Sequence, residues 1–235
     1  MRTAAWCVAL CFATGAGVSQ TAVSSTSAQG IATAVQIDRI YFDFELAALQ
    51  PPHWGFEINS DGVGRYFEHG LPVGANLSGE AGQAIQVSAP TMEVLLAGRI
   101  ALDGNKDCNS RNKKVAQTGK KTLSYEHDNV WSTCQFNYSD DVGVMRAVLA
   151  FQAMAATMEF GERLKHEHRF DKLGLDAELE SLIDEASGGR AMEIQNIAST
   201  LQSLVADDTL MDRVRRKAQR LLDQSSGTAS IERPR

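Results

Sequence analysis

The period of the hydrophobic pattern changes near Tyr138, and this change constrains the fold more than any other feature of the sequence. In residues 37–138 apolar and polar side chains alternate, as they do over residues 40–46, and most of the aromatic residues and glycines lie here. Alternation with a period of two is typical of half-buried strands. After residue 140 the apolar residues recur at the spacing of amphipathic helices. The sequence therefore predicts an α+β fold, in which an antiparallel sheet with a helix on one face precedes an all-α region of helical hairpins.

Two hairpins are predicted within the first part of the chain. Asp61-Gly62 lies at the first turn, where glycine accepts the positive φ that a tight turn requires, and Asp128-Asn129 lies at the second. The paired strands are residues 54–59 with 63–68, and residues 122–126 with 130–138. Aromatic residues in strands are more often core than sugar-stacking platforms, so we expect a buried position for Trp54, Phe56, Tyr66 and Phe67.

Five helices are predicted, one beside the sheet and four after it. Ala89-Pro90-Thr91 opens the first, because proline suits the first turn of a helix. The next runs from about Val144 to about His166, and the one after it is capped by Asp176 and stopped by Gly188-Gly189. The last two cover residues 194–204 and the residues that follow Asp207. These patterns predict an α+β antiparallel-sheet domain over 32–138, a helical domain over 139–224 and a disordered tail over 225–235.

The first 28 residues have the pattern of a signal peptide. A positive start at Arg2 precedes an uncharged apolar stretch over residues 4–18, and Thr26-Ser27-Ala28 fits the small-x-small site of a signal peptidase. Cleavage near Ala28 would make the protein periplasmic or secreted. No integral membrane segment is expected after cleavage, since no later apolar run reaches spanning length.

Export determines how the four cysteines are interpreted. Cys7 and Cys11 lie inside the predicted signal peptide, so cleavage leaves Cys108 and Cys134 as an even pair in an oxidising compartment. A redox-active pair or a pair of metal ligands is the alternative, but neither cysteine has C-x-x-C or ligand spacing. We therefore predict a disulfide between Cys108 and Cys134, which the chain-entropy model values at about 3.5 kcal/mol.

A basic segment between the two cysteines is the candidate binding site. The chain carries a formal net charge of −6, which gives it no general reason to bind nucleic acid, yet residues 105–121 hold six cations against Asp107. Such a segment could bind an anionic partner, either an envelope protein or an anionic polymer; the alternative is a solvated loop. The cations are Lys106, Arg111, Lys113, Lys114, Lys120 and Lys121.

No catalytic motif is present, and the catalytic residues stay unknown at this point. Asp103, Asn105 and Asp107 alternate like the first ligands of a calcium loop, but Lys114 stands where such a loop needs glutamate, so a polar loop is the better interpretation. A cluster of charged residues near His166 offers too few ligands on one helix face for zinc: Glu162, His166, His168 and Asp171. We predict no metal and no cofactor.

Scattered residues across about 37–139 carry a resemblance to a group of known proteins. They are Ile37-Asp38-Arg39-Ile40, Asp61-Gly62 followed by Arg65-Tyr66, Val87-Ser88-Ala89-Pro90, and Cys108 with residues 134–139. This pattern resembles uncharacterised secreted bacterial proteins in which a small β-rich domain precedes helices. The resemblance implies export and the order of the two regions, and it implies no activity.

Together these observations predict a non-enzymatic, exported protein that binds a partner in the cell envelope. A second hypothesis is a small periplasmic hydrolase that uses His127 with Glu126 or Asp128. A third is a structural protein whose helices dimerise.

Overall fold

The computed structural model describes residues 37–69, 82–102, 108–110 and 116–230. The predicted signal peptide and cleavage site therefore lie outside the described residues. The described residues belong to one compact unit.

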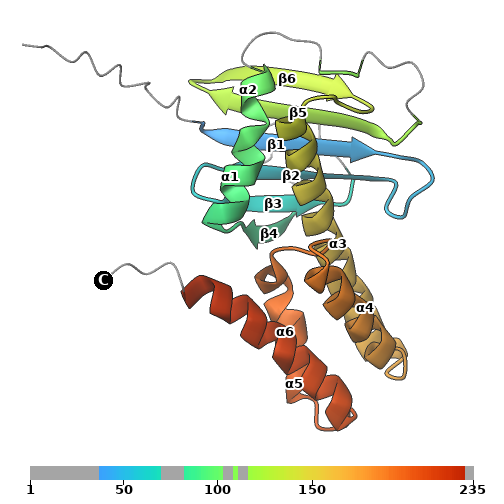
Figure 1. The fold of residues 1–235 in the computed structure, drawn as a ribbon. Helices are drawn as coiled ribbons and strands as arrows, with labels where there is room; N and C mark the ends of the chain where they lie inside the picture. Colours follow the sequence, from blue (N-terminus) through green and yellow to red (C-terminus); the bar gives the residue numbers. More distant parts are fainter. Residues whose placement is uncertain (1–36, 70–81, 103–107, 111–115, 231–235) are drawn as a thin grey trace, which may run out of the picture. The chain divides into compact units, whose positions relative to one another are not determined.

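A six-stranded antiparallel sheet forms the first part of this unit (Figure 1). The strand order is β4-β3-β2-β1-β5-β6, and every neighbouring pair is antiparallel. The strands are β1 (Arg39–Glu45), β2 (His53–Asn59), β3 (Val63–Phe67), β4 (Gln83–Gln86), β5 (Lys120–His127) and β6 (Val130–Phe136). The predicted α+β class is confirmed.

Both predicted hairpins form, and their turns explain why. Gly62 has a φ of 80°, and its N–H donates to the carbonyl oxygen of Asn59 at 3.0 Å. A Cβ on Gly62 would lie 2.4 Å from the carbonyl oxygen of Val87, so the turn needs glycine for its dihedral angle and for this close approach. Asp128 and Asn129 both have positive φ, 49° and 60°, which is the pattern of a type I′ turn.

The two faces of the sheet differ in chemistry. Side chains that point toward the helices form cross-strand rows of buried apolar residues, such as Phe56, Phe42, Leu123 and Cys134. The opposite face has polar rows, such as Glu57, Tyr41, Ser124 and Thr133. The alternation of β1 predicted this division. Tyr41 is nevertheless only 3% exposed, although it lies on the polar face.

Three helices cover the apolar face of the sheet (Figure 1). They are α1 (Ala89–Ala97), α2 (Arg99–Leu102) and the first half of α3 (Val142–Phe170). α1 has proline in its first turn, as the sequence predicts, and the side chain of Asp141 caps α3 by accepting from the Val144 N–H at 2.9 Å. The Phe151 ring of α3 stacks on the Phe42 ring of β1, with a centroid distance of 4.4 Å.

The remaining helices pack as antiparallel neighbours and depart from the predicted boundaries in three places. They are α4 (Leu175–Ser187), the 3₁₀ helix η1 (Ile194–Ile197), α5 (Ala198–Ala206) and α6 (Asp212–Ser230). Gly174 and not Asp176 is the N-cap of α4, because the Asp176 carboxylate binds Lys217 of α6 at 3.0 Å. Asp207 lies in the turn before α6, where it accepts hydrogen bonds from Thr209. The predicted tail is helical as far as Ser230, because α6 continues past residue 224.

Two apolar cores lie along α3, and they do not divide at the predicted domain boundary. Residues of α3 up to Met158 pack with α1 and the sheet, whereas Phe160 and Leu164 pack with α4, α5 and α6. The sheet ends near residue 138, but the cores separate inside one continuous helix. The change in the period of the apolar residues marks the end of the sheet in the sequence. Nothing in the sequence marks the point inside α3 at which the two cores separate.

The helices of the described residues do not meet the requirements of a membrane span. Within the described part of the chain, no helix is both long enough and apolar enough to cross a bilayer.

Candidate functional site

The predicted basic segment is only partly within the described residues. Lys106, Arg111, Lys113 and Lys114 lie outside them. Lys120 is exposed at the start of β5, where its ammonium lies 3.6 Å from the Glu45 carboxylate. Lys121 points the other way and is buried. An anionic partner for this segment therefore stays a prediction.

The Lys121 ammonium is enclosed by oxygen acceptors. It donates to the carbonyl oxygens of Asn137 at 2.8 Å, Thr118 at 3.0 Å and Gly119 at 3.1 Å, and to the Thr118 hydroxyl at 3.1 Å. It also lies 5.2 Å from the centroid of the Phe44 ring. Burial lowers the pKa of Lys121 from 10.5 to about 8. These contacts fasten the segment before β5 to the end of β6, which is a structural role.

We expect this lysine to make stability depend on pH. Because its folded pKa lies below its unfolded pKa, the unfolded chain binds more protons between about pH 8 and pH 10, and stability rises with pH there. The four acceptors oppose the effect of burial, so we expect a rise of about 1 to 2 kcal/mol relative to the Lys121→Met variant. Urea unfolding of both proteins at pH 7 and pH 10 measures it. Burial also raises the pKa of Tyr66 and Tyr125, but this affects both proteins equally, so parallel profiles would contradict the prediction.

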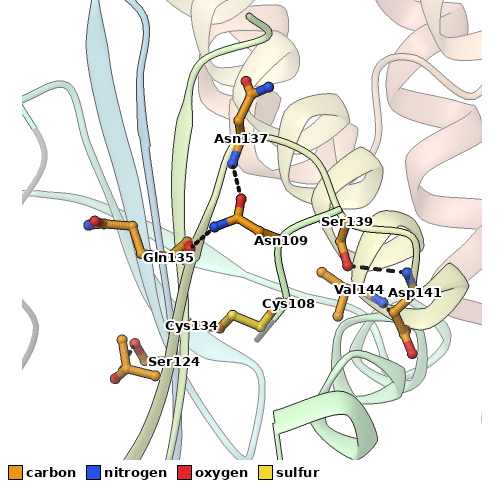
Figure 2. The surroundings of a disulfide bond; sticks show 10 residues. Cys108, Asn109, Ser124, Cys134, Gln135, Asn137, Ser139, Asp141 and Val144 are labelled. Atoms are coloured by element: carbon orange, nitrogen blue, oxygen red, sulfur yellow. Dashed lines mark hydrogen bonds between the residues drawn. A yellow bond between two sulfur atoms is a disulfide. The ribbon is translucent and has the colours of Figure 1, made fainter. Parts of the chain in front are cut away.

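The predicted disulfide is present, and it holds Asn109 against β6 at the edge of the sheet. Cys108 and Cys134 are joined, with their Cα atoms 6.2 Å apart. Next to the bond, the Asn109 amide donates to the Gln135 carbonyl oxygen at 3.2 Å and accepts from the Asn137 N–H at 3.1 Å (Figure 2). One side-chain amide thus makes the two hydrogen bonds that a neighbouring strand would make with β6.

The residues of the hydrolase hypothesis are engaged elsewhere or exposed. The Glu126 carboxylate accepts from the Arg39 guanidinium at 2.6 Å and not from His127. His127 Nε2 lies 3.3 Å from the Asp128 carboxylate, and these two residues with Asp38 form a small group with possible metal-ligand atoms. Asp38 already accepts from the Asp128 N–H at 2.8 Å, and the Asp128 side chain is 85% exposed. This geometry is that of a hydrogen-bonded turn.

The charged residues near His166 are not brought together either. The Glu162 carboxylate pairs with Lys165 at 2.6 Å, and the His166 ring lies against Phe170. His168 Nε2 lies 2.9 Å from the Asp207 carboxylate, which a hydrogen bond from Lys172 also stabilises. These donors lower the pKa of Asp207 and tie the α3–α4 connection to the α5–α6 connection.

A histidine–carboxylate pair lies on the polar face of the sheet. His53 Nε2 of β2 is 2.9 Å from the Asp43 carboxylate of β1, and the Tyr41 hydroxyl donates to the same carboxylate at 3.4 Å. Burial raises the pKa of Asp43, and the bond from His53 opposes the rise. The pair is a cross-strand contact on a sheet surface, and it does not line the cavity described next.

A cavity of about 770 Å³ lies where the two cores meet. We call it the junction cavity. Four parts of the chain line it: the β2–β3 turn at Asp61, the connection from β4 to α1, the segment from the end of α4 to η1, and α6. Its lining comprises Asp61, Gln86, Val87, Ser88, Ala89, Pro90, Thr91, Ala186, Ser187, Ala191, Met192, Glu193, Ile194, Gln195, Gln224 and Ser225.

Glu193 anchors one wall of the junction cavity to the other. Its carboxylate accepts from the Ser88 N–H at 3.0 Å, from the Ser88 hydroxyl at 2.7 Å, and from Thr91 and Gln195. It therefore sits at the N-terminus of α1, where a negative charge is stabilised by the helix dipole. Glu193 has φ 60° and ψ 45°, a left-handed conformation that costs a residue with a Cβ about 1 kcal/mol or more. The four hydrogen bonds hold the backbone in that conformation.

Further hydrogen bonds hold the walls of the cavity together. The amides of Gln195 and Asn196 bind the carbonyl oxygen and the N–H of Gln86, at 3.1 Å and 2.8 Å. The backbone of Met192 is bonded to α3. Its N–H donates to the Ala153 carbonyl oxygen, and its carbonyl oxygen accepts from the Thr157 hydroxyl. The walls of the cavity are thus positioned by β4, α1 and α3 together.

Sequence reasoning did not find this site. In the sequence Ser88 and Thr91 only flank the predicted helix start at Ala89-Pro90, and Glu193 lies more than a hundred positions away, in a connection between two helices. Of the residues that donate to Glu193 only Gln195 is near it in the sequence, and the one local irregularity is Gly188-Gly189 five residues earlier. No model of a known protein family matches this chain, and no curated protein matches it either.

Proposed function

We propose that this protein is an exported, non-enzymatic binding protein of the cell envelope, and that the junction cavity holds its ligand. The volume of the cavity carries the proposal. About 770 Å³ lies within the range of small-molecule sites, and such sites occur preferentially where two packed units meet.

The hydrogen bonding of the cavity supports binding over catalysis. The hydroxyls of Ser88 and Thr91 both donate to the Glu193 carboxylate, and the described residues of the lining include no histidine or lysine that could activate either hydroxyl as a nucleophile. Fixed walls also favour binding, because a preformed site loses little conformational entropy when its ligand arrives.

Two observations support export. The disulfide between Cys108 and Cys134 is of a kind that persists in oxidising compartments, and the first 28 residues have the pattern of a signal peptide. The basic segment remains a second candidate surface, for an anionic envelope partner.

A cavity-filling variant tests the proposal. Ala89 is an exposed residue of the first turn of α1 and lines the cavity, so Ala89→Trp should occupy it without disturbing a core. We expect native mass spectrometry of protein isolated from its own cells to show a small-molecule adduct on the wild type that is lost in Ala89→Trp. Ala97→Trp is the matched control, since Ala97 is exposed at the other end of the same helix and does not line the cavity. A wild type with the mass of the bare chain would refute the proposal.

A further inference from the structure

We infer that the ligand of the junction cavity is a small organic ammonium compound with an apolar body. The inference rests on the proposed function, because it names the chemistry that the same cavity would recognise. Charge, helix orientation and the apolar lining each contribute to it.

The charged side chains of the cavity are all acidic. Glu193 is a half-buried residue of its wall, and Asp61 is an exposed residue of its lining. Among the described residues that line the cavity there is no lysine, arginine or histidine. A site lined by one sign of charge raises the local concentration of ligands of the opposite sign and repels ligands of the same sign.

Helix orientation adds to this negative field. Ala186 and Ser187, the last two residues of α4, line the cavity, so the C-terminal end of a 13-residue helix faces it. The C-terminus of a helix carries a partial negative charge and stabilises cations nearby. The opposing field comes from the N-terminus of α1, but Glu193 already sits there and accepts the bond from the Ser88 N–H. An anionic ligand would have to displace Glu193 to use that helix end.

The Glu193 carboxylate itself is saturated. Its two oxygens accept four hydrogen bonds, which is about the number that a carboxylate can accept. It therefore contributes charge and not a directional bond, so the ligand needs a positive charge in the cavity but no particular hydrogen-bond pattern at Glu193.

Part of the remaining lining is apolar and suits a hydrocarbon body. Val87 and Pro90 contribute from the sheet side, and Ala191, Met192 and Ile194 from the connection after α4. Val87 and Ala191 are buried, so this wall is the inner one. A ligand with a cationic head and an apolar body would match both parts of the cavity.

Three ten-carbon probes of different charge test the inference on the full chain. Decylammonium, decane-1,2-diol and decanoate are titrated separately by calorimetry, below the concentrations at which they form micelles. We expect decylammonium to bind about tenfold more tightly than decanoate, with the diol between them, because two partly exposed carboxylates are each worth a modest ion-pair energy. The preference should shrink as salt is added.

An isosteric variant locates the charge. Asp61→Asn keeps an oxygen for the Val63 N–H, to which Asp61 is bonded at 2.9 Å, so the turn should fold as before. We expect this variant to reduce the preference for decylammonium over decanoate about threefold. Asp208→Asn, at an exposed position outside the cavity, should leave the preference unchanged.

The outcomes separate the two proposals. If decanoate binds as tightly as decylammonium, and Ala89→Trp abolishes both, the cavity is a ligand site and the charge inference is overturned. If Ala89→Trp leaves the binding of every probe unchanged, no probe enters the cavity, and both the inference and the proposed site are overturned.

Discussion

Phe151→Ala is expected to reduce the free energy of unfolding by about 4 kcal/mol, the largest effect that we expect from a single substitution in this chain. The ring of Phe151 has no exposed surface. It stacks on Phe42 of β1 and lies 5.6 Å from the centroid of the Phe56 ring of β2, so it is the contact through which α3 packs on the centre of the sheet. Alanine would leave a cavity between two layers that cannot close without moving the whole helix. Chemical unfolding at equilibrium measures the loss.

Phe170→Ala provides the matched control on the same helix. The Phe170 side chain is 65% exposed at the end of α3, so its removal should change the free energy of unfolding by no more than about 0.5 kcal/mol. If the two variants lost similar amounts, the loss would reflect the helix propensity of phenylalanine and alanine and not the stacking on the sheet.

Removing the disulfide is expected to have the second largest effect, a loss of about 3.5 kcal/mol in the Cys108→Ser, Cys134→Ser double variant. The two cysteines are 26 positions apart, and the bond restricts the unfolded chain between them. It also joins the residues after α2 to β6, an edge strand of the sheet. Urea unfolding of the oxidised protein and of the variant measures the difference.

The single variants distinguish a cross-link from ordinary packing. Either serine alone breaks the same bond, so each single variant should lose about as much as the double variant. Losses that add between the two sites would indicate that the sulfur atoms stabilise the fold by packing, and would contradict this prediction. Wild type treated with reductant should also match the double variant.

The sequence predicts well those features that depend on neighbours along the chain. Both hairpins, the alternation of β1 and the opening of α1 with Ala89-Pro90 are confirmed, because a turn, a helix start or a half-buried strand is determined by a few adjacent residues. The disulfide also follows from the sequence, since the two cysteines outside the predicted signal peptide leave only one pairing.

Features that depend on distant contacts could not be predicted in the same way. Lys121 is part of a basic segment in the sequence, yet its place in the strand turns it toward Phe44 and away from solvent. Asp176 has the chemistry of an N-cap, but Lys217 on another helix binds its carboxylate. Glu193 acquires its role only when the connection after α4 packs on the start of α1. In each case a partner far along the chain decides the outcome.

Side-chain amides cover backbone groups on both edge strands of the sheet, and this affects whether two copies of the protein can associate through these strands. An edge strand with free backbone groups can template the addition of a strand from another molecule, which is the first step of edge-to-edge polymerisation. On β4, the side-chain amides of Gln195 and Asn196 already bind the carbonyl oxygen and the N–H of Gln86. On β6, the side-chain amide of Asn109 already binds the carbonyl oxygen of Gln135. A second chain would have to displace these amides before it could add a strand there. Because Asn109 follows Cys108 directly, reducing the disulfide would loosen the amide that covers β6. The amides that cover β4 would stay in place.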